Sequence, residues 1–514
     1  MDGPANNSNK SAEPATHRRP RLSVIRKTAV GSGLAVACLA LYVLWFVHGR
    51  PDPAVDYLAL LNETNRPKEL SSEDNAWPLY RQAIELLVDP DAPDLHESIF
   101  DYRGRRFSEL APAEQTAVAA WVERNRDAWR QFVAASRKPR YHRPCRPVSA
   151  PDELLAGLDV PTVNIDMTHL ESFQTLRALA IWHSRIEATR GRVQDGFDDA
   201  LAIVRAGRHL DRSKLLVEML SGLALCSAGH TQILEIASTH KFFPAEVERF
   251  RNELRNAFGT DYPTLDLDGE RIVFRDIVQH IFTKGGIGGG HLIPRYLPPL
   301  IRTHSVIKTL GELDTETNAG QMAFYTAIAL VHTRRSETMR RYRALCDRAE
   351  AIAGMTPFRR KRDNISLGVK RPHIFNFHVH LDSFAAQSRD FVATARLPAV
   401  ERMSDILHQT RTLHEATATV LALIAYRLDT GDYPDDLPQL LRAGYLDQLP
   451  QDPFSDRPLV YRKIDGDFTL YSVGRNFADQ GGQTASAGGK HRPVIWGTDA
   501  DAVFWPAPYQ SAGN

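Results

Sequence analysis

The sequence predicts a mainly α-helical, membrane-anchored protein that ends in a small α+β module. An uncharged apolar run lies near the N-terminus, helical hydrophobic periodicity dominates the middle of the chain, and short β-rich runs with tight turns follow a long helix near its end. We therefore expect four parts. They are a disordered cytoplasmic tail (1–27), a transmembrane anchor (28–48), an irregular α-helical, helical-hairpin extracytoplasmic body (55–397) and the C-terminal module (398–508).

Bulk composition excludes few functions. The chain has 514 residues, enough for two or three domains with their own cores. Its 63 Lys and Arg residues balance 62 Asp and Glu residues, so we expect no nucleic-acid partner. The four cysteines lie far apart and form no CxxC pair, which argues against a zinc knuckle or a redox motif. Cys226 follows an apolar helical stripe and is predicted to be a buried free thiol.

The anchor is the run Thr28–Val47, which carries no formal charge. A helix of this length spans roughly 30 Å, the thickness of the hydrocarbon core of a bilayer. Basic residues precede the run, with few after it, so we expect a single pass through the inner membrane with the N-terminus in the cytoplasm. A cleaved signal peptide is the alternative, but this apolar run continues too far. A lipoprotein box at "AVAC" is disfavoured because apolar sequence follows Cys38.

Residues 168–191 predict an amphipathic helix that Gly191 ends. The next run, "DGFDDALAIVRAGRHL", predicts a second helix antiparallel to the first. A third helix is expected over 211–238, where Ser221, Gly222, Gly229 and neighbouring small residues permit close helix contact. A fourth is expected over 317–353. These units resemble tetratricopeptide-type hairpins only generically, because no repeat of about 34 residues is present.

Two segments of the body admit a ligand-binding and a structural interpretation. "KGGIGGGHL" (284–292) has the glycines of a phosphate loop but lacks the strand before it, so a hinge or loop is favoured. The basic run "FRRKRDN" (358–364) is suited to anionic lipid or a polyanion, but a solvated loop is the commoner role of such runs.

A third segment, "RPHIFNFHVHLDSF", alternates apolar and polar residues, so His378 and His380 are predicted to share one face of a strand. Such a pair binds zinc or another transition metal in metallohydrolases. Further ligands are not visible in the sequence, and no GxSxG-type nucleophile motif occurs. A polar strand or loop is the alternative.

The C-terminal module predicts a definite order of elements. A long Ala- and Leu-rich helix ends near "DTGDYP", and "DDLPQLLRAGYL" forms a short second helix. The turn-rich "LPQDPFSDRPL" comes next. "LVYRK" and "FTLYSV" then form two strands joined by "IDGD", a strong hairpin signal.

This order resembles the C-terminal half of the major pseudopilin of type II secretion systems, over roughly residues 405–506. That family has, in order, a long helix, a "tG.YP" turn, a "P.DPw" turn, a hairpin, "lySlG" and a final acidic element. In this chain "GTDADAVFW" resembles the final acidic element. The matching residues are Tyr426, Gly431, Tyr433, Pro434, Leu446, Leu449, Pro450, Asp452, Pro453, Tyr461, Leu470, Tyr471, Ser472, Gly474, Gly481 and Gly482.

The resemblance implies a structural calcium ion in the last loop. Carried over by position, its side-chain ligands are Asn476, Asp479, Asp499 and Asp501. Calcium takes six to eight oxygen ligands, and an exported domain meets millimolar calcium. In this chain Asn476 replaces the family's first loop aspartate, and the insertion "QTASAGGKHRPVIW" separates the two halves of the site. A loop held by Asx hydrogen bonds is the alternative.

The anchor lacks the prepilin peptidase site and the glutamate of the pseudopilins, so we do not expect this chain to polymerise. The layout of anchor, helical body and pseudopilin-like end resembles that of large membrane-anchored proteins of planctomycete-type bacteria. We therefore expect a membrane-anchored binding or scaffold protein with protein partners, in an envelope- or secretion-related assembly. The competing hypothesis is a metal-dependent hydrolase that uses His378 and His380.

Overall fold

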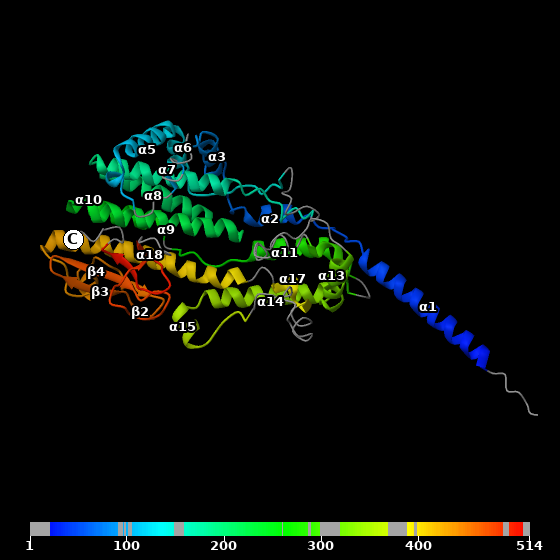
Figure 1. Ribbon diagram of the computed structural model, residues 1–514. Coiled ribbons are helices and arrows are strands. Elements are labelled where there is room, and N and C mark those ends of the chain that lie inside the picture. The colour runs from blue at the N-terminus through cyan, green and yellow to red at the C-terminus, as the bar shows by residue number, and fades with distance from the viewer. Residues whose placement is uncertain are drawn as a thin grey trace, which may run out of the picture.

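The computed structural model is mainly helical, with one long helix that leaves the body and small sheets near the C-terminus (Figure 1). The predicted fold class is therefore confirmed at this level. The structure describes residues 21–90, 96, 99–100, 105–148, 159–259, 261–285, 289–298, 319–368, 388–394, 398–486 and 493–506.

Helix α1 (Arg21–Val47) is the projecting helix, and its span Val30–Val47 is the one described segment long and apolar enough to cross a membrane. It begins inside the segment predicted to be a disordered tail. Its side chains are exposed from Val30 to Trp45, whereas Phe46 is buried against the body. This distribution is consistent with a single-pass anchor that meets the body at its C-terminal end.

The body is built in layers that Figure 1 shows edge-on. The outer layer consists of the short helices α3, α5 and α6, the long helices α7 to α10 lie beneath it, and α2 packs on α11. The bounds are α2 (Tyr57–Asn65), α3 (Trp77–Glu85), η1 (Phe107–Glu109), α5 (Pro112–Arg124), α6 (Arg126–Ser136), α7 (His169–Thr189), α8 (Val193–Leu210), α9 (Leu216–Thr239) and α10 (Pro244–Phe258).

The antiparallel pair α7 and α8 confirms the helical periodicity of the sequence, and Gly191 joins them with a positive φ of 79°. Helix α9 starts at Leu216, later than predicted. Backbone N–H groups at this point bond to other elements: Lys214 N–H, before the helix, donates to Asn65 Oδ1, and Leu216 N–H, at its first residue, donates to Glu270 Oε1.

Helices α8 and α9 approach closely because glycines face each other across their contact. A Cβ atom on Gly222 would lie 2.4 Å from the backbone nitrogen of Asp211, and one on Gly207 would lie 2.6 Å from Gly222 O. Real Cβ contacts are never this short, so the backbones pack together only without side chains. The small residues predicted to permit close contact therefore do so at Gly222.

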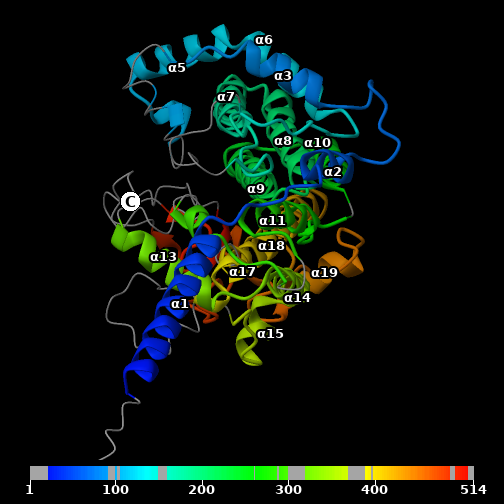
Figure 2. The same cartoon turned by 90° about the vertical axis from the view of Figure 1, so that its right-hand side faces the viewer.

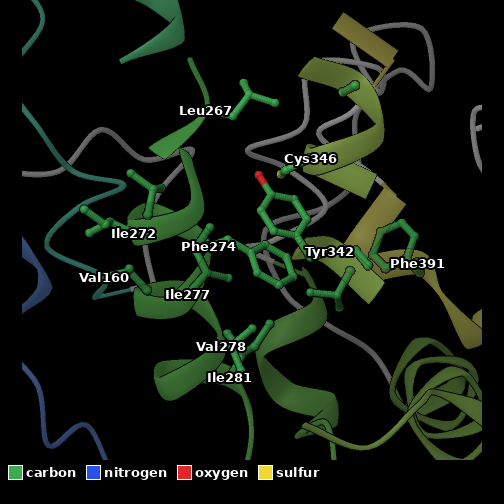
Figure 3. Close-up of a cluster of buried hydrophobic side chains, with 14 of the residues drawn as sticks. Val160, Leu267, Ile272, Phe274, Ile277, Val278, Ile281, Tyr342, Cys346 and Phe391 are labelled. Atoms are coloured by element: carbon green, nitrogen blue, oxygen red, sulfur yellow. The ribbon is translucent and has the colours of Figure 1, made fainter. Parts of the chain in front are cut away.

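A second group of helices follows α10 in the chain, and its members α11 and α13 lie nearest the anchor (Figure 1). A core cluster fills this group, in which Phe274 of α11 stacks on Tyr342 of α14 with ring centroids 3.6 Å apart (Figure 3). The bounds are α11 (Asp268–Ile281), η3 (Pro294–Tyr296), α13 (Ala319–Val331), α14 (Arg335–Ala353), α15 (Pro357–Arg362) and α17 (Phe391–Thr394).

The single helix predicted over 317–353 is wrong, because the structure breaks it into α13 and α14. Thr333 donates its N–H and its hydroxyl to Arg389 O, and Arg335 N–H donates to Gly290 O. These bonds use donors that a continuous helix would direct to its own backbone. Partners distant in sequence thus cause the break.

The C-terminal module has the predicted order of elements. A three-stranded antiparallel sheet, β3–β4–β7, packs beside the long helix α18, and the β3–β4 hairpin pairs Ile464 with Asp467 at its turn. The bounds are α18 (Pro398–Thr430), α19 (Leu437–Arg442), β1 (Gln451–Asp452), β2 (Arg457–Pro458), β3 (Val460–Ile464), β4 (Asp467–Ser472), β5 (Ala485–Ser486), β6 (Pro493–Val494) and β7 (Ala502–Trp505).

The module shares a hydrophobic core with the body. One cluster joins Phe197, Val204 and Phe250 of the body to Leu421 of α18 and Leu470 of β4. In Figure 1 the strands lie at the end of the body away from α1. The domain boundary at residue 397 stays a prediction from the sequence, and the hydrophobic core extends across it.

Candidate functional site

A groove with a cavity volume of about 710 Å³ lies between helices α5, α6, α7 and α8. It forms where α6 packs on α8 and α5 packs on α7, near the outer layer of the body that Figure 2 shows from the end of the molecule. Its lining residues are Ala119, Val122, Glu123, Arg126, Trp129, Arg130, Val133, Ala134, Arg137, His183, Ile186, Glu187, Arg190, Arg192, Asp195, Asp198 and Asp199.

Three side chains from three helices meet at the floor of the groove. His183 of α7 places Nδ1 2.7 Å from Asp199 Oδ2 of α8, and the Trp129 indole N–H of α6 donates to Asp199 Oδ1 at 2.7 Å. The Trp129 and His183 rings stack at 4.2 Å with an interplanar angle of 25°. Asp199 is fully buried, so its two hydrogen bonds are what permit a carboxylate there.

Protonation of this pair follows from burial and charge. Burial raises the pKa of Asp199 to about 6, although the hydrogen bond and charge of His183 and the hydrogen bond of Trp129 act against it. Burial opposes protonation of His183, but the hydrogen bond and charge of Asp199 raise the pKa of His183 above its ordinary value. Because the pKa of His183 is raised above its ordinary value and Asp199 titrates lower, we assign the shared proton to His183 Nδ1.

The second ring nitrogen of His183, Nε2, makes no hydrogen bond with any described residue, and the side chain is partly exposed in the groove. A histidine oriented by a buried carboxylate in this way presents Nε2 to a ligand, as a donor or as an acceptor. Among the described residues that line the groove there is no Ser, Thr, Cys, Lys or Tyr. The arrangement therefore supports hydrogen bonding or proton exchange, and the described lining residues that could act as nucleophiles are His183 and the carboxylates.

The two walls of the groove differ in charge. Arg126, Arg130 and Arg137 follow one face of α6 and its C-terminal cap, whereas Asp195 and Asp198 lie on α8. Arg130 pairs with Asp127 at 3.4 Å, but both side chains are exposed, and such surface pairs break at little cost. The basic wall is therefore free to exchange its partners for acidic groups of a ligand.

A second charged cluster lies inside the body. The buried Glu218 accepts hydrogen bonds from Arg143 at 2.9 Å and Ser213 at 2.5 Å, and His169 Nε2 lies 2.9 Å away. Burial opposes ionisation, but these partners lower the pKa of Glu218 to about 2. The cluster joins the segment before α7 to the start of α9, so we interpret it as structural.

The residues predicted to bind calcium lie in the loop after β4 and in the segment just before β7 of the module. Asp501 is buried and accepts the N–H groups of Gln480 and Gly482, and Asp479 is exposed and accepts the Tyr471 hydroxyl and the Gly481 N–H.

Asn476 closes an Asx turn with Ala478 N–H at 3.0 Å, and Asp499 is exposed. No group of three or more His, Cys, Asp or Glu side chains arranged to hold a metal occurs in the described part of the chain. In this arrangement the loop oxygens take up backbone donors, as in the Asx alternative, and do not gather around an ion. Calcium stays a prediction of the resemblance.

His378 and His380 lie outside the described residues, so the structure does not bear on the alternative metal site. Most of the basic run 358–364 is exposed, as predicted for a solvated segment, but residues 358–362 belong to helix α15 and not to a loop. Lys361 lies 4.2 Å from the Phe477 ring centroid, and Phe358 N–H donates to Pro453 O. These contacts join the body to the module.

The groove was not predicted from the sequence, although one signal was present. Asp199 interrupts the apolar face of a helix on which Phe197, Ala200 and Leu201 are buried, and a buried carboxylate requires partners. Its partners come from α6 and α7, and their identity depends on the packing.

No protein-family model, no curated protein and no solved structure matches the chain.

Proposed function

We propose that the chain is a membrane-anchored binding protein whose body holds a segment of a protein partner in the groove between α5 and α8. The anchor is α1, placed in the inner membrane with the N-terminus in the cytoplasm and the body outside. The single apolar helix near the N-terminus and the basic residues that precede its apolar run support this placement.

The observation that carries the proposal is the stack of Trp129 on His183 above the buried Asp199. An aromatic ring and an oriented imidazole at the floor of a charged groove are suited to recognition, since aromatic and Arg side chains dominate the energetics of protein interfaces. The lining residues that the structure describes include no Ser, Thr, Cys, Lys or Tyr, which favours binding over covalent catalysis by those groups.

The charges of the walls indicate the chemistry of the partner. Acidic side chains of the partner would face Arg126, Arg130 and Arg137, and a hydrogen-bonding group would reach His183 Nε2. The pseudopilin-like module then serves as a rigid end of the body. Its resemblance is the basis for proposing an envelope- or secretion-related assembly, which is an argument by analogy.

The experiment is a quantitative pull-down from native membranes with the full-length chain as bait. The test variant is the double charge reversal Arg130→Glu and Arg137→Glu, because both side chains are exposed and their loss leaves the core intact. The control variant is Arg442→Glu on α19, whose side chain is also exposed and lies outside the groove.

We expect a protein recovered with wild type and with the control to fall at least about tenfold with the double variant, as the loss of two charged contacts implies. Equal recovery with all three baits would contradict the groove as the binding site. Recovery that falls equally with the control would point to general charge effects and would also contradict the proposal.

A further inference from the structure

Helix α13 carries no charged residue, although one of its faces is exposed. Ala323, Ala327, Leu330 and Val331 recur at steps of three and four residues and form that face. Leu330 is 54% exposed and Val331 is 41% exposed. Helices at the surface of soluble proteins place charged and polar residues on the outward face. The outward face of α13 therefore suits an apolar environment better than water.

Helix α13 lies beside the point where α1 leaves the body. Figures 1 and 2 both place α13 next to the base of α1. The contacts agree, because η3 packs against α13, and His291, just before η3, stacks on Phe46 of α1 at 4.3 Å. His291 Nε2 also lies 3.1 Å from Phe46 O.

The segment that connects α1 to the body is held by several contacts. Pro51 pairs with Thr283, Asp52 lies 2.8 Å from Lys284, and Gln279 bonds to the backbone of Ala54 and Val55. Such a connection holds the body at a fixed position directly against the membrane that contains α1. The surface around the exit of α1, which includes α13, is thereby kept at the bilayer.

Basic side chains surround this surface. Arg50 and Arg334 are exposed, and Lys284 is 78% exposed. The pKa of Asp52 is lowered by its hydrogen bond to Lys284 and by the charges of Lys284 and Arg335, which shows that Arg335, at the start of α14, lies near the exit of α1. Helices that lie in a membrane interface combine an apolar face with such basic neighbours.

We propose that α13 lies in the interface of the bilayer that holds α1, with Leu330 and Val331 at the level of the headgroups and upper acyl chains. The basic residues around it then face anionic headgroups. This inference rests on the membrane insertion of α1 and does not depend on the partner of the groove. A soluble protein is a poor occupant of the face, since the tight connection leaves no space for one between the body and the bilayer.

The test places an environment-sensitive fluorophore on single cysteines of the full-length chain in lipid vesicles. Among the described cysteines only Cys38 is exposed, so wild type labelled at Cys38 reports the insertion of α1. Two further proteins carry Cys38→Ala with Leu330→Cys or with Leu441→Cys. Leu441 is 40% exposed on α19, at the far end of the molecule, and serves as the matched control.

We expect lipids with a nitroxide on the upper acyl chain to reduce the emission of the Leu330 label by about twofold or more, as for an interfacial helix, and to leave the Leu441 label unchanged. Phosphatidylglycerol vesicles should give a larger effect at Leu330 than phosphatidylcholine vesicles. If Cys38 is quenched and Leu330 behaves like Leu441, α1 is inserted and the proposal is wrong. If Cys38 itself is not quenched, both the anchor and the interfacial helix are refuted.

Discussion

Asp452 of the "DPF" turn offers the sharpest test of how the C-terminal module is held together. Its side chain is fully buried, and each carboxylate oxygen accepts one backbone N–H and one hydroxyl. Oδ1 accepts from Phe454 N–H at 3.0 Å and the Ser472 hydroxyl at 2.7 Å. Oδ2 accepts from the Ser455 hydroxyl and Val473 N–H, both at 3.1 Å. One carboxylate thus joins the turn to the end of β4.

The substitution Asp452→Asn keeps the shape but replaces one oxygen with an N–H₂ group. In either orientation of the amide, its N–H₂ group faces one backbone N–H, that of Phe454 or of Val473, and that donor loses its acceptor. Leaving one buried donor unsatisfied costs about 1–3 kcal/mol, while the serine hydroxyl can rotate to accept. Asp452→Ala leaves both backbone donors unsatisfied and should cost about 2–6 kcal/mol.

The assay is hydrogen exchange with mass spectrometry, which measures local opening and suits a chain too large for two-state unfolding. For Asp452→Asn, about 1–3 kcal/mol corresponds to exchange about 5 to 150 times faster in peptides that contain Phe454 and Val473. The control is Asp447→Asn, whose side chain is 92% exposed, with an expected effect within about 0.5 kcal/mol.

Exchange in Asp452→Asn within about twofold of wild type would refute the reasoning, because a twofold change corresponds to less than about 0.5 kcal/mol. Equal acceleration in Asp452→Asn and Asp447→Asn would refute it as well, since the exposed residue makes none of the four buried bonds.

Three further predictions concern packing, pH and calcium. Gly222→Ala should lower the free energy of unfolding by about 1–3 kcal/mol, as for an overpacked core, and should therefore lower the melting temperature. Ser221→Ala, at the neighbouring half-buried position, should change the melting temperature little, and equal melting of the two variants would contradict the close contact. Burial lowers the pKa of His230 to about 4, below its unfolded value, so its contribution to stability is present above pH 6.5 and is lost as the pH falls towards 4. The free energy of unfolding of wild type relative to His230→Gln should therefore decrease by up to about 1.4 kcal/mol per pH unit in that window. If the free energies of unfolding of the two proteins fall equally as the pH is lowered, the prediction is wrong. The pseudopilin resemblance predicts that millimolar calcium raises the melting temperature and that Asp479→Ala and Asp501→Ala abolish the rise. If neither calcium nor a chelator changes the melting temperature of wild type, the calcium prediction is wrong and the loop is held by its hydrogen bonds to the backbone.

Much of the fold was predictable because it depends on local periodicity. The helices α7 and α8, with Gly191 between them, follow from apolar spacing and a residue that tolerates positive φ. The hairpin β3–β4 follows from Asp465-Gly466 between two β-rich runs. In each case the decisive residues lie within a few positions of the element that they determine.

Features that depend on distant partners were not predictable. The break between α13 and α14 results from bonds of Thr333 to Arg389 and of Arg335 to Gly290, and no local helix breaker marks it. The merging of the module with the body results from a core that joins α8, α9 and α10 to α18 and the strands. Hydrophobic periodicity identifies the buried face of each helix but not the face that it meets.

The groove illustrates the same limit for function. Trp129, His183 and Asp199 stand on three helices and are brought together only by the packing of α6, α7 and α8. A sequence motif needs fixed spacing, and nothing fixes the distance in sequence between α6 and α7. The buried carboxylate was the one local signal that a polar partner had to exist.

Site-specific photo-crosslinking in native membranes tests the proposed binding groove most directly. A photoreactive amino acid replaces Arg130 in the groove or, as the control, Leu441 on α19, in the full-length chain. We predict a discrete crosslinked protein from the Arg130 position, none from the Leu441 position, and loss of the product when His183→Ala is added. No crosslinked protein from the groove, or the same products from both positions, would contradict the account.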